Sequence, residues 1–369
     1  MLSTRLSQFS ELSLVDQIRK KFGRRSKDIP VGIGDDAAVL KPRNELLLLT
    51  TDMMVEGVHF DLRFITAYQL GFKLISVNVS DIYAMGGDPF SVLLNIAVIR
   101  DTGKEFIDAF FEGVNDAMTL YRTRLIGGDI SSADKGMSLS ATLIGYARKC
   151  IQRSGAKVGD KIYVTGPLGD SACGLELLKK IRGHVPVGNE YSGGVVRRTT
   201  FSGVLPGRKA IKGGGRSEDK RLKDMLSRSG LSWNVIEPLL RRHLMPVARN
   251  PKKVLPFAAS MIDVSDGLLI DLSRLCDASR VGARIYEENI PMSSELKETG
   301  SHFGISPLGL ALSGGEDYEL LFTAPAGKKV KALHIGDVIK SGRWIVDDSG
   351  KEKTFSAEGY QHFGTRSGI

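Results

Sequence analysis

The order of hydrophobic and polar positions predicts strands that alternate with helices along the first 150 residues. Runs rich in apolar and β-branched residues predict strands over 46–52, 91–99 and 138–146. Apolar residues at helical spacing predict helices over 11–23, 67–87 and 103–121. In the helix over 67–87, Asp81 falls on the same side as Leu70, Leu74 and Asn78. A carboxylate is therefore expected on a largely apolar helix face.

A polar, glycine-containing segment at 153–160 predicts a domain boundary. Beyond it, 161–166 predicts a strand that leads through a glycine-rich turn to a helix beginning near Ser171. The pattern over 261–279 predicts a strand, a turn and a helix, and that over 310–324 a strand, a loop and a strand. We expect an α/β (or α+β) chain in two lobes, residues 1–150 and 151–369.

Composition supports a globular protein. Among 369 residues, 42% are hydrophobic and 25% are charged, which excludes a wholly disordered or fibrous chain. The sequence contains no apolar run of the ~20 residues that cross a bilayer, and the start contains no secretory apolar segment. Cys150, Cys173 and Cys276 are widely spaced, which argues against a disulfide scaffold and a structural zinc site. These features predict a cytoplasmic protein with no membrane partner.

The net charge of +9 is concentrated in one segment. Residues 194–230 contain ten Lys and Arg against three acidic residues, together with a GGG triplet. A nucleic-acid surface is one interpretation of this basic stretch. The absence of a sustained apolar period favours a solvated insertion in the second lobe, at about 195–235.

Candidate chemistry lies in aspartates that follow hydrophobic runs. Such runs lead to Thr50-Thr51-Asp52, to Asp129, and to Asp263 and Asp266, and Asp36 and Asp81 add to the set. Because strand ends in an open α/β sheet meet at one rim, we expect these carboxylates to converge there. An all-oxygen ligand set suits Mg²⁺, which shares its coordination with water and nucleotide phosphates.

Each of these residues also has a purely structural interpretation. An aspartate in a glycine turn is ordinary turn chemistry, and Ser265 or Asp266 could cap the following helix. The turn at 166–171 is either a phosphate nest or a plain strand-to-helix turn. Recurrence of the aspartate pattern in five segments favours a metal site. The P-loop and protein-kinase motifs are absent.

Several long motifs closely resemble the thiamine-monophosphate kinase family. They occur in the family order and are GIGDDAAVL, TTDMMVEGVHF, NVSDIYAMGGDP, IGGDISSAD, RSGAKVGDKIYVTGPLGDSACGLELL, IDVSDGLLIDL and LSGGEDYELLFT. The resemblance covers nearly the whole chain except the basic insertion. It implies transfer of phosphate from ATP to thiamine monophosphate, giving thiamine diphosphate, with several Mg²⁺ ions. It also implies a homodimer in which the N-terminal lobes close a β-barrel, beside C-terminal α/β lobes.

The resemblance also implies roles for individual residues. The metal-binding set comprises Asp36, Thr50, Thr51, Asp52, Asp81, Asp129, Asp263 and Asp266. The ATP-binding set comprises Gly128, Asp129, Arg153 and Ser265. The thiamine side comprises His59, Glu316 and Tyr360. Because the acceptor is itself a phosphate oxygen, no covalent nucleophile is expected.

Structural interpretations remain for the thiamine-side residues. Tyr360 could pack in a C-terminal tail, His59 could be a hydrogen-bonded histidine at a strand end, and Glu316 could be a turn acid. The glycines beside Glu316 favour a ligand role, since they permit close backbone approach.

Two other functions remain open at this point. One is an ATP-dependent enzyme of the same superfamily with a different acceptor, although a selenophosphate synthetase would carry a Cys near its N-terminus and the first here is Cys150. The other is a nucleic-acid-binding protein that uses the basic insertion.

Overall fold

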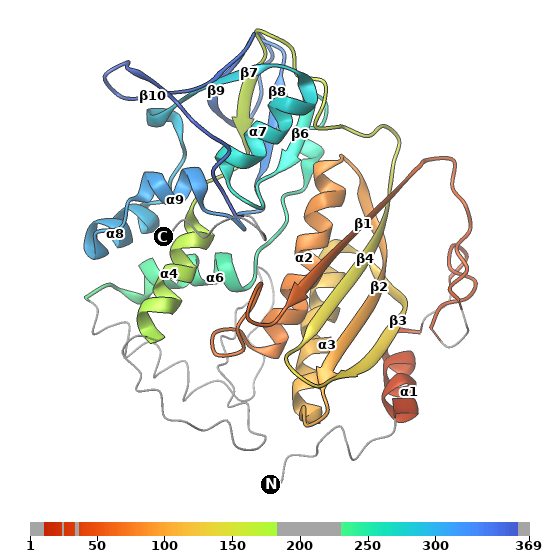
Figure 1. The fold of residues 1–369 in the computed structure, drawn as a ribbon. Coiled ribbons are helices and arrows are strands. Elements are labelled where there is room, and N and C mark those ends of the chain that lie inside the picture. The colour runs from red at the N-terminus through yellow and green to blue at the C-terminus, as the bar shows by residue number, and fades with distance from the viewer. Residues whose placement is uncertain (1–10, 24–25, 34–36, 183–229, 361–369) are drawn as a thin grey trace. The chain divides into compact units, whose positions relative to one another are not determined.

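The computed structural model describes residues 11–23, 26–33, 37–182 and 230–360, and Figure 1 shows their elements. These residues form two compact units. One lies within Met1–Ile82 and Gly87–Lys149, and the other within Tyr83–Gly86, Cys150–His184 and Met225–Ile369. Both units combine helices with a β-sheet, so the predicted mixed α/β class is confirmed.

The first unit contains a four-stranded sheet with helices against one face (Figure 1). Its elements are α1 (Glu11–Phe22), β1 (Leu46–Val55), α2 (Ala67–Ala84), β2 (Asp88–Ile99), α3 (Lys104–Tyr121), β3 (Arg124–Ala133) and β4 (Ser138–Ala147). The strand order is β1-β4-β2-β3. The β1–β4 and β4–β2 pairs are antiparallel, whereas β2 and β3 are parallel. Strands β1 and β3 are therefore the two edges of this sheet.

Helices α2 and α3 pack closely because each presents a glycine to the other. A Cβ at Gly71 would lie 2.2 Å from the carbonyl oxygen of Phe110, and one at Gly113 would lie 1.9 Å from that of Tyr68. Any larger side chain would force the two helices apart. This packing fixes α2, the helix that carries Asp81.

The second unit is built on a seven-stranded sheet with the order β11-β10-β7-β9-β5-β8-β6. Its strands are β5 (Lys161–Val164), β6 (Ser260–Asp263), β7 (Gly282–Tyr286), β8 (Leu320–Ala324), β9 (Leu333–Ile339), β10 (Arg343–Val346) and β11 (Glu352–Thr354). Its helices are α4 (Asp170–Arg182), α6 (Trp233–Leu244), α7 (Leu268–Ser279), α8 (Ser294–Phe303) and α9 (Pro307–Ser313), with single 3₁₀ turns at Pro251–Lys253 and Glu287–Asn289. One hydrophobic core joins α7 to β5, β6, β7, β8 and β9.

One sequence prediction in this unit is wrong. Residues 310–313 were expected in a strand but belong to helix α9, which begins with a Ser306 cap and Pro307. A serine cap followed by proline is a strong helix start, and it outweighs the short apolar run LGLAL. Helix α6 begins at Trp233, near the end of the predicted insertion, and buries Ile236 and Leu239 just beyond it. Residues 195–229 of the insertion lie outside the described residues.

Among the helices that the structure describes, none is both long enough and apolar enough to cross a membrane.

Candidate functional site

One group of predicted residues joins strand β1 to helix α2 in the first unit. The Thr50 hydroxyl donates a 2.5 Å hydrogen bond to Oδ2 of Asp81. Two residues along the strand, the backbone N–H of Asp52 donates a 3.0 Å bond to Oδ1 of Asn78. Asn78 is completely buried, and its amide donates to the carbonyl of Leu74, which fixes its orientation. Thr50 and Asp52 therefore share a sheet face, and both are tied to the helix that carries Asp81.

The structure does not bring Thr51 into this group. Its side chain lies on the opposite face, where Oγ1 donates to the carbonyl of Ala141 at 3.1 Å and accepts from the Thr142 hydroxyl at 3.2 Å. Successive side chains of a strand point to opposite faces of the sheet. Because Thr51 and Asp52 are neighbours in the sequence, their side chains lie on opposite faces. A metal role for Thr51 stays a prediction.

In the described strands of the first unit, the predicted residues do not lie at strand ends. Thr50, Thr51 and Asp52 lie within β1, and Asp129 lies within β3. Because β4 and β2 separate these edge strands, Asp52 and Asp129 are three strand spacings apart, or about 14 Å. A shared metal role for Asp52 and Asp129 stays a prediction.

The glycine beside Asp129 has a structural cause. Gly128 has a φ of 150°, and a Cβ there would lie 1.9 Å from the carbonyl oxygen of Leu94 on β2. Close approach of the two strands therefore requires glycine at this position, whatever ligand approaches it. Contact of Gly128 with ATP stays a prediction.

His59 is fixed at the end of β1. Its Nδ1 accepts a 3.0 Å hydrogen bond from the backbone N–H of Val55, and Gly57 between them has a φ of 81°. The structure thus bears out a hydrogen-bonded histidine in a tight turn. The Nδ1 acceptor role sets the ring orientation, and contact of His59 with thiamine stays a prediction.

In the second unit, three loops bring four predicted residues together. The N–H of Glu316 donates to the carbonyl of Ser265 at 2.7 Å, and the N–H of Tyr360 donates to the carbonyl of Asp266 at 3.0 Å. Gly315 makes this contact close, since a Cβ there would lie 2.6 Å from the Ser265 carbonyl oxygen. The glycine next to Glu316 is therefore explained by backbone packing. Residues assigned to ATP, metal and thiamine thus meet at the end of β6.

Glu316 is held in a strained conformation. Its φ is 64°, a left-handed value that is uncommon for a residue with a side chain, and Tyr318 has a φ of 50°. A carboxylate oxygen of Glu316 lies 3.0 Å from Nδ1 of His243 on α6, and that nitrogen is 3.2 Å from the Ser171 hydroxyl. Strained residues cluster at ligand sites, which is consistent with a functional loop here.

Two residues of α7 that sequence reasoning missed organise the Asp266 loop. Oδ2 of Asp271 accepts hydrogen bonds from the N–H groups of Ser265, Asp266 and Gly267 at 3.1, 3.0 and 3.2 Å. Arg274 donates from one nitrogen to Oδ2 of Asp266 at 2.6 Å and to Oδ1 of Asp271 at 2.7 Å. Asp271 is fully buried, and burial raises its pKa to about 6. The Asp-x-x-Arg spacing was the available signal, since residues three apart meet on a helix.

This arrangement decides between two interpretations of the loop. Gly267 occupies the N-cap position of α7 without a side-chain capping bond, so neither Ser265 nor Asp266 caps the helix. The carboxylate of Asp271 instead satisfies the loop N–H groups from within the first turn. The Asp266 side chain, which is 30% exposed, is thus not needed as a cap.

The hydrogen bonds of the glycine-rich turn at 166–171 also decide between its two interpretations. The N–H groups of Gly169 and Ser171 donate to the buried carboxylate of Asp317 at 2.6 and 3.2 Å. Burial raises the pKa of Asp317 to about 7, although Arg242 and these two hydrogen bonds oppose the shift. Because a carboxylate already occupies these donors, the turn is a structural one and not a phosphate nest.

The remaining predicted residues fall at separate places. Asp263 is the last residue of β6 and is 4% exposed, so here the prediction of an aspartate at a strand end is confirmed. Arg153 is exposed, and its carbonyl accepts from the Ser279 hydroxyl at 3.1 Å. Asp36 lies outside the described residues.

The oxygen donors in the described part of the chain fit Mg²⁺. Three or more His, Cys, Asp or Glu residues do not group there as a preformed metal centre. Mg²⁺ is commonly held by one or two carboxylates, with water and phosphate completing its octahedron, and separate carboxylates suit that pattern. Asp266 already binds one cation, the guanidinium of Arg274.

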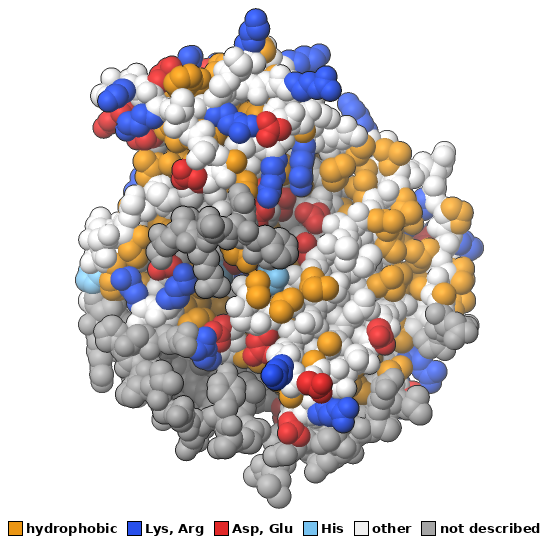
Figure 2. Space-filling view, viewed as in Figure 1, with side chains coloured by type: hydrophobic (Ala, Val, Ile, Leu, Met, Phe, Trp, Pro, Cys, Tyr) orange, Lys and Arg blue, Asp and Glu red, His pale blue; other side chains and the backbone are white. Residues whose placement is uncertain are grey.

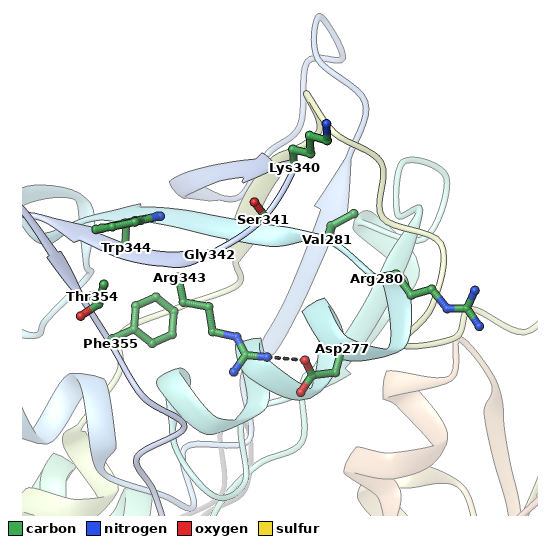
Figure 3. Close-up of a pocket in the computed structure, with 10 residues that line it drawn as sticks. All are labelled: Asp277, Arg280, Val281, Lys340, Ser341, Gly342, Arg343, Trp344, Thr354 and Phe355. Carbon is green, nitrogen blue, oxygen red and sulfur yellow. Dashed lines mark hydrogen bonds and ion pairs between the residues drawn. The ribbon is translucent and has the colours of Figure 1, made fainter.

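A surface cavity of about 480 Å³ lies elsewhere in the second unit (Figure 3). It is lined by Arg280, Lys340, Arg343 and Trp344 among others, and by none of the predicted site residues. Arg343 pairs with Asp277, whereas Arg280 and Lys340 point away from one another. The cations do not converge, so the cavity is not the candidate site.

Comparison with known proteins defines the class. Residues 34–147 match the AIR synthase related protein N-terminal domain, and residues 218–347 match the C-terminal domain of the same class. The chain is 33% identical over 363 residues to a thiamine-monophosphate kinase of Aquifex aeolicus (strain VF5), covering 97% of this chain and all of that one. The chain belongs to the thiamine-monophosphate kinase family.

Solved structures agree with this placement. A structure described as AaThiL complexed with AMPPCP and TMP is 32% identical, with a TM-score of 0.68 over 98% of this chain and all of that one. The thiamine-monophosphate kinase of Stenotrophomonas maltophilia K279a is 30% identical, with a TM-score of 0.71 over 93% of this chain and 98% of that one.

Proposed function

We propose that this protein transfers the γ-phosphate of ATP to thiamine monophosphate, producing ADP and thiamine diphosphate. Similarity to thiamine-monophosphate kinases along 97% of the chain carries the proposal, because a match of that length extends over both units. The related structure complexed with AMPPCP and TMP supports the choice of both ligands.

The carboxylates are the residues that would hold Mg²⁺. When bound, the ions neutralise phosphate charge and orient the transferring group. Thr50 holds the carboxylate of Asp81, and Asn78 holds the backbone of Asp52. Asp263 and Asp266 present further oxygens in the second unit, and Thr51, Asp129 and Asp36 complete the proposed set. ATP would contact Gly128, Arg153 and Ser265.

The thiamine side is proposed at Glu316, Tyr360 and His59. Thiamine carries a thiazolium cation, which an aromatic face and a carboxylate both attract. Tyr360 is 46% exposed and its backbone is bonded to Asp266, so its ring is accessible beside a proposed metal ligand. Glu316 is bonded to Ser265 in the same group of loops.

Transfer is proposed to be direct and in line. The acceptor is an ionised phosphate oxygen at neutral pH, so neither a strong base nor a covalent nucleophile is required. The main obstacle is repulsion between two polyanions, which cations and positioning residues reduce. The chain therefore contributes alignment and charge rather than a phosphoenzyme.

A homodimer is proposed through the edge of the four-stranded sheet. Leu47, Leu49 and Met53 on one face of β1 are 55, 64 and 59% exposed, and Figure 2 shows hydrophobic side chains gathered over this unit. Among the described strands, β1 pairs with β4 alone. A long apolar edge strand favours pairing with another chain. Closing two such sheets into a barrel would cover it.

Light scattering tests the dimer. The parent should have twice the chain mass, and Leu49→Lys should shift it toward the monomer. A parent that stays monomeric at micromolar concentration would contradict the barrel without affecting the proposed reaction.

The reaction is tested by incubating the protein with Mg²⁺, ATP and thiamine monophosphate and separating the products by chromatography. Thiamine diphosphate and ADP should form in equal amounts. Asp266→Asn should reduce turnover by at least 100-fold with the fold intact, whereas Asp277→Asn on α7 should not. ATP consumption that ignores thiamine monophosphate would instead favour a family member with a different acceptor.

A further inference from the structure

We propose that Arg274 is a positioning residue for the metal ligand Asp266, and that it stays on that carboxylate when a divalent cation binds. The inference rests on the proposed function only in taking Asp266 as a ligand. It assigns a role to Arg274, a side chain on α7 that contacts the carboxylate of Asp266.

The geometry holds Arg274 between two carboxylates. One guanidinium nitrogen lies 2.6 Å from Oδ2 of Asp266 and 2.7 Å from Oδ1 of Asp271. The other oxygen of Asp271 accepts three backbone N–H groups of the loop from Ser265 to Gly267. Asp271 thus fixes the loop backbone. Arg274, which is bonded to Asp271, fixes the side chain of Asp266.

Burial explains why Arg274 would not leave. The Asp271 side chain is fully buried, and Arg274 is 38% exposed. Departure of the guanidinium would leave a buried carboxylate without its counter-charge, which is strongly unfavourable. Arg274 is therefore anchored to Asp271, and its contact with Asp266 follows from that anchor.

The contact with Arg274 occupies one carboxylate oxygen of Asp266 and leaves the other available to a cation. Arg274 uses Oδ2 of Asp266, and Oδ1 has no hydrogen-bond partner among the described residues. A divalent cation can bind Oδ1 while Arg274 retains Oδ2. Hydrogen bonds behind a ligating carboxylate orient it, and their loss commonly reduces metal affinity 10- to 100-fold. The competing role, in which Arg274 blocks the cation, predicts the opposite sign.

The test measures Mn²⁺ binding by electron paramagnetic resonance in the presence of AMPPCP, without turnover. Arg274→Met keeps the length of the side chain and removes its charge, and Arg274→Lys keeps the charge. The matched control is Arg343→Met, which removes another arginine paired with α7, through Asp277 at its other end (Figure 3). Thermal unfolding of each metal-free variant reports separately on stability.

We expect Arg274→Met to bind Mn²⁺ about tenfold more weakly, Arg274→Lys to recover part of that loss, and Arg343→Met to match the parent. If Arg274→Met does not fold, Mn²⁺ binding by Arg274→Lys that is weaker than that of the parent supports the positioning role instead. Folded Arg274→Met that binds Mn²⁺ as tightly as the parent, or more tightly, would overturn the proposal, even if its melting temperature falls.

Failure of the proposed function is distinguishable. If Arg274→Met weakens Mn²⁺ binding but the parent does not phosphorylate thiamine monophosphate, the positioning role stands and the acceptor is wrong. If Asp266→Asn binds Mn²⁺ like the parent, Asp266 is not a ligand and the positioning role fails with it.

Discussion

The Thr50 hydroxyl donates a 2.5 Å hydrogen bond to the carboxylate of Asp81, joining the edge strand β1 to helix α2 across 31 positions of the chain. The hydroxyl has a single proton and donates it to Oδ2 of Asp81. This bond therefore favours one orientation of the Asp81 carboxylate. A hydrogen bond to a charged group contributes about 1.5–3 kcal/mol, enough to keep one carboxylate orientation.

Thr50→Val should therefore increase the Mg²⁺ concentration needed for half-maximal turnover. We expect kcat/KM at limiting Mg²⁺ to fall about tenfold, equivalent to about 1.4 kcal/mol, because the Asp81 carboxylate loses the Thr50 hydroxyl as a donor while the strand keeps its shape. Thr50→Ser, which retains the hydroxyl, serves as the control. Identical Mg²⁺ dependence in the Val variant and the parent would show that the bond does not support the site.

Gly128→Ala should destabilise the protein whether or not ATP contacts this residue. Its Cβ would lie 1.9 Å from the Leu94 carbonyl oxygen, so β2 and β3 must separate. A loss above about 2 kcal/mol is expected in the free energy of unfolding without nucleotide. Gly57→Ala, with a φ of 81° but no atom within 4 Å of the new Cβ, should cost only about 1 kcal/mol. Equal unfolding curves for the two variants would contradict the steric explanation.

The buried carboxylate of Asp317 should make stability depend on pH near neutrality. Its pKa is raised from 3.8 to about 7, so between these values the folded state binds a proton that the unfolded state does not. This contribution to stability is complete below pH 3.8 and is lost as pH rises through about 7. Melting temperatures of the metal-free protein should thus fall between about pH 4 and 7 more steeply in the parent than in Asp317→Asn. Parallel profiles would place the pKa of Asp317 elsewhere.

Tyr360→Ala should weaken thiamine monophosphate binding more than ATP binding. An aromatic ring beside a cation contributes about 0.5–2 kcal/mol, so a loss of up to about 30-fold is expected. Tyr360→Phe keeps the ring face and should retain most of the affinity. Calorimetric titrations that show the same loss for both ligands in Tyr360→Ala would place Tyr360 away from the thiamine side.

The sequence predicts where helices and strands occur better than it predicts which of them lie side by side in the fold. Apolar spacing over 67–87 correctly predicts α2 and the placement of Asp81 among buried residues, and the run before Asp263 correctly predicts β6. Strand order depends on pairing between distant segments, which local patterns do not encode. The order β1-β4-β2-β3 therefore separates Asp52 from Asp129, although both follow hydrophobic runs.

Side-chain direction and supporting residues were also beyond the sequence pattern. Thr51 faces away from Asp52 because alternation along β1 separates neighbours. Asp271 and Arg274 look like an ordinary helical ion pair in the sequence. Their importance comes from the fold, which places the Asp266 loop directly over the first turn of α7.

The central claim is direct phosphoryl transfer from ATP to thiamine monophosphate. Its most direct test is a single-turnover reaction with excess protein, Mg²⁺ and ATP labelled with ³²P at the γ-phosphate. The label should pass to thiamine diphosphate at the rate at which ATP disappears, and none should remain on denatured protein. Label that accumulates on the protein, or that appears only as inorganic phosphate whether or not thiamine monophosphate is present, would contradict the account.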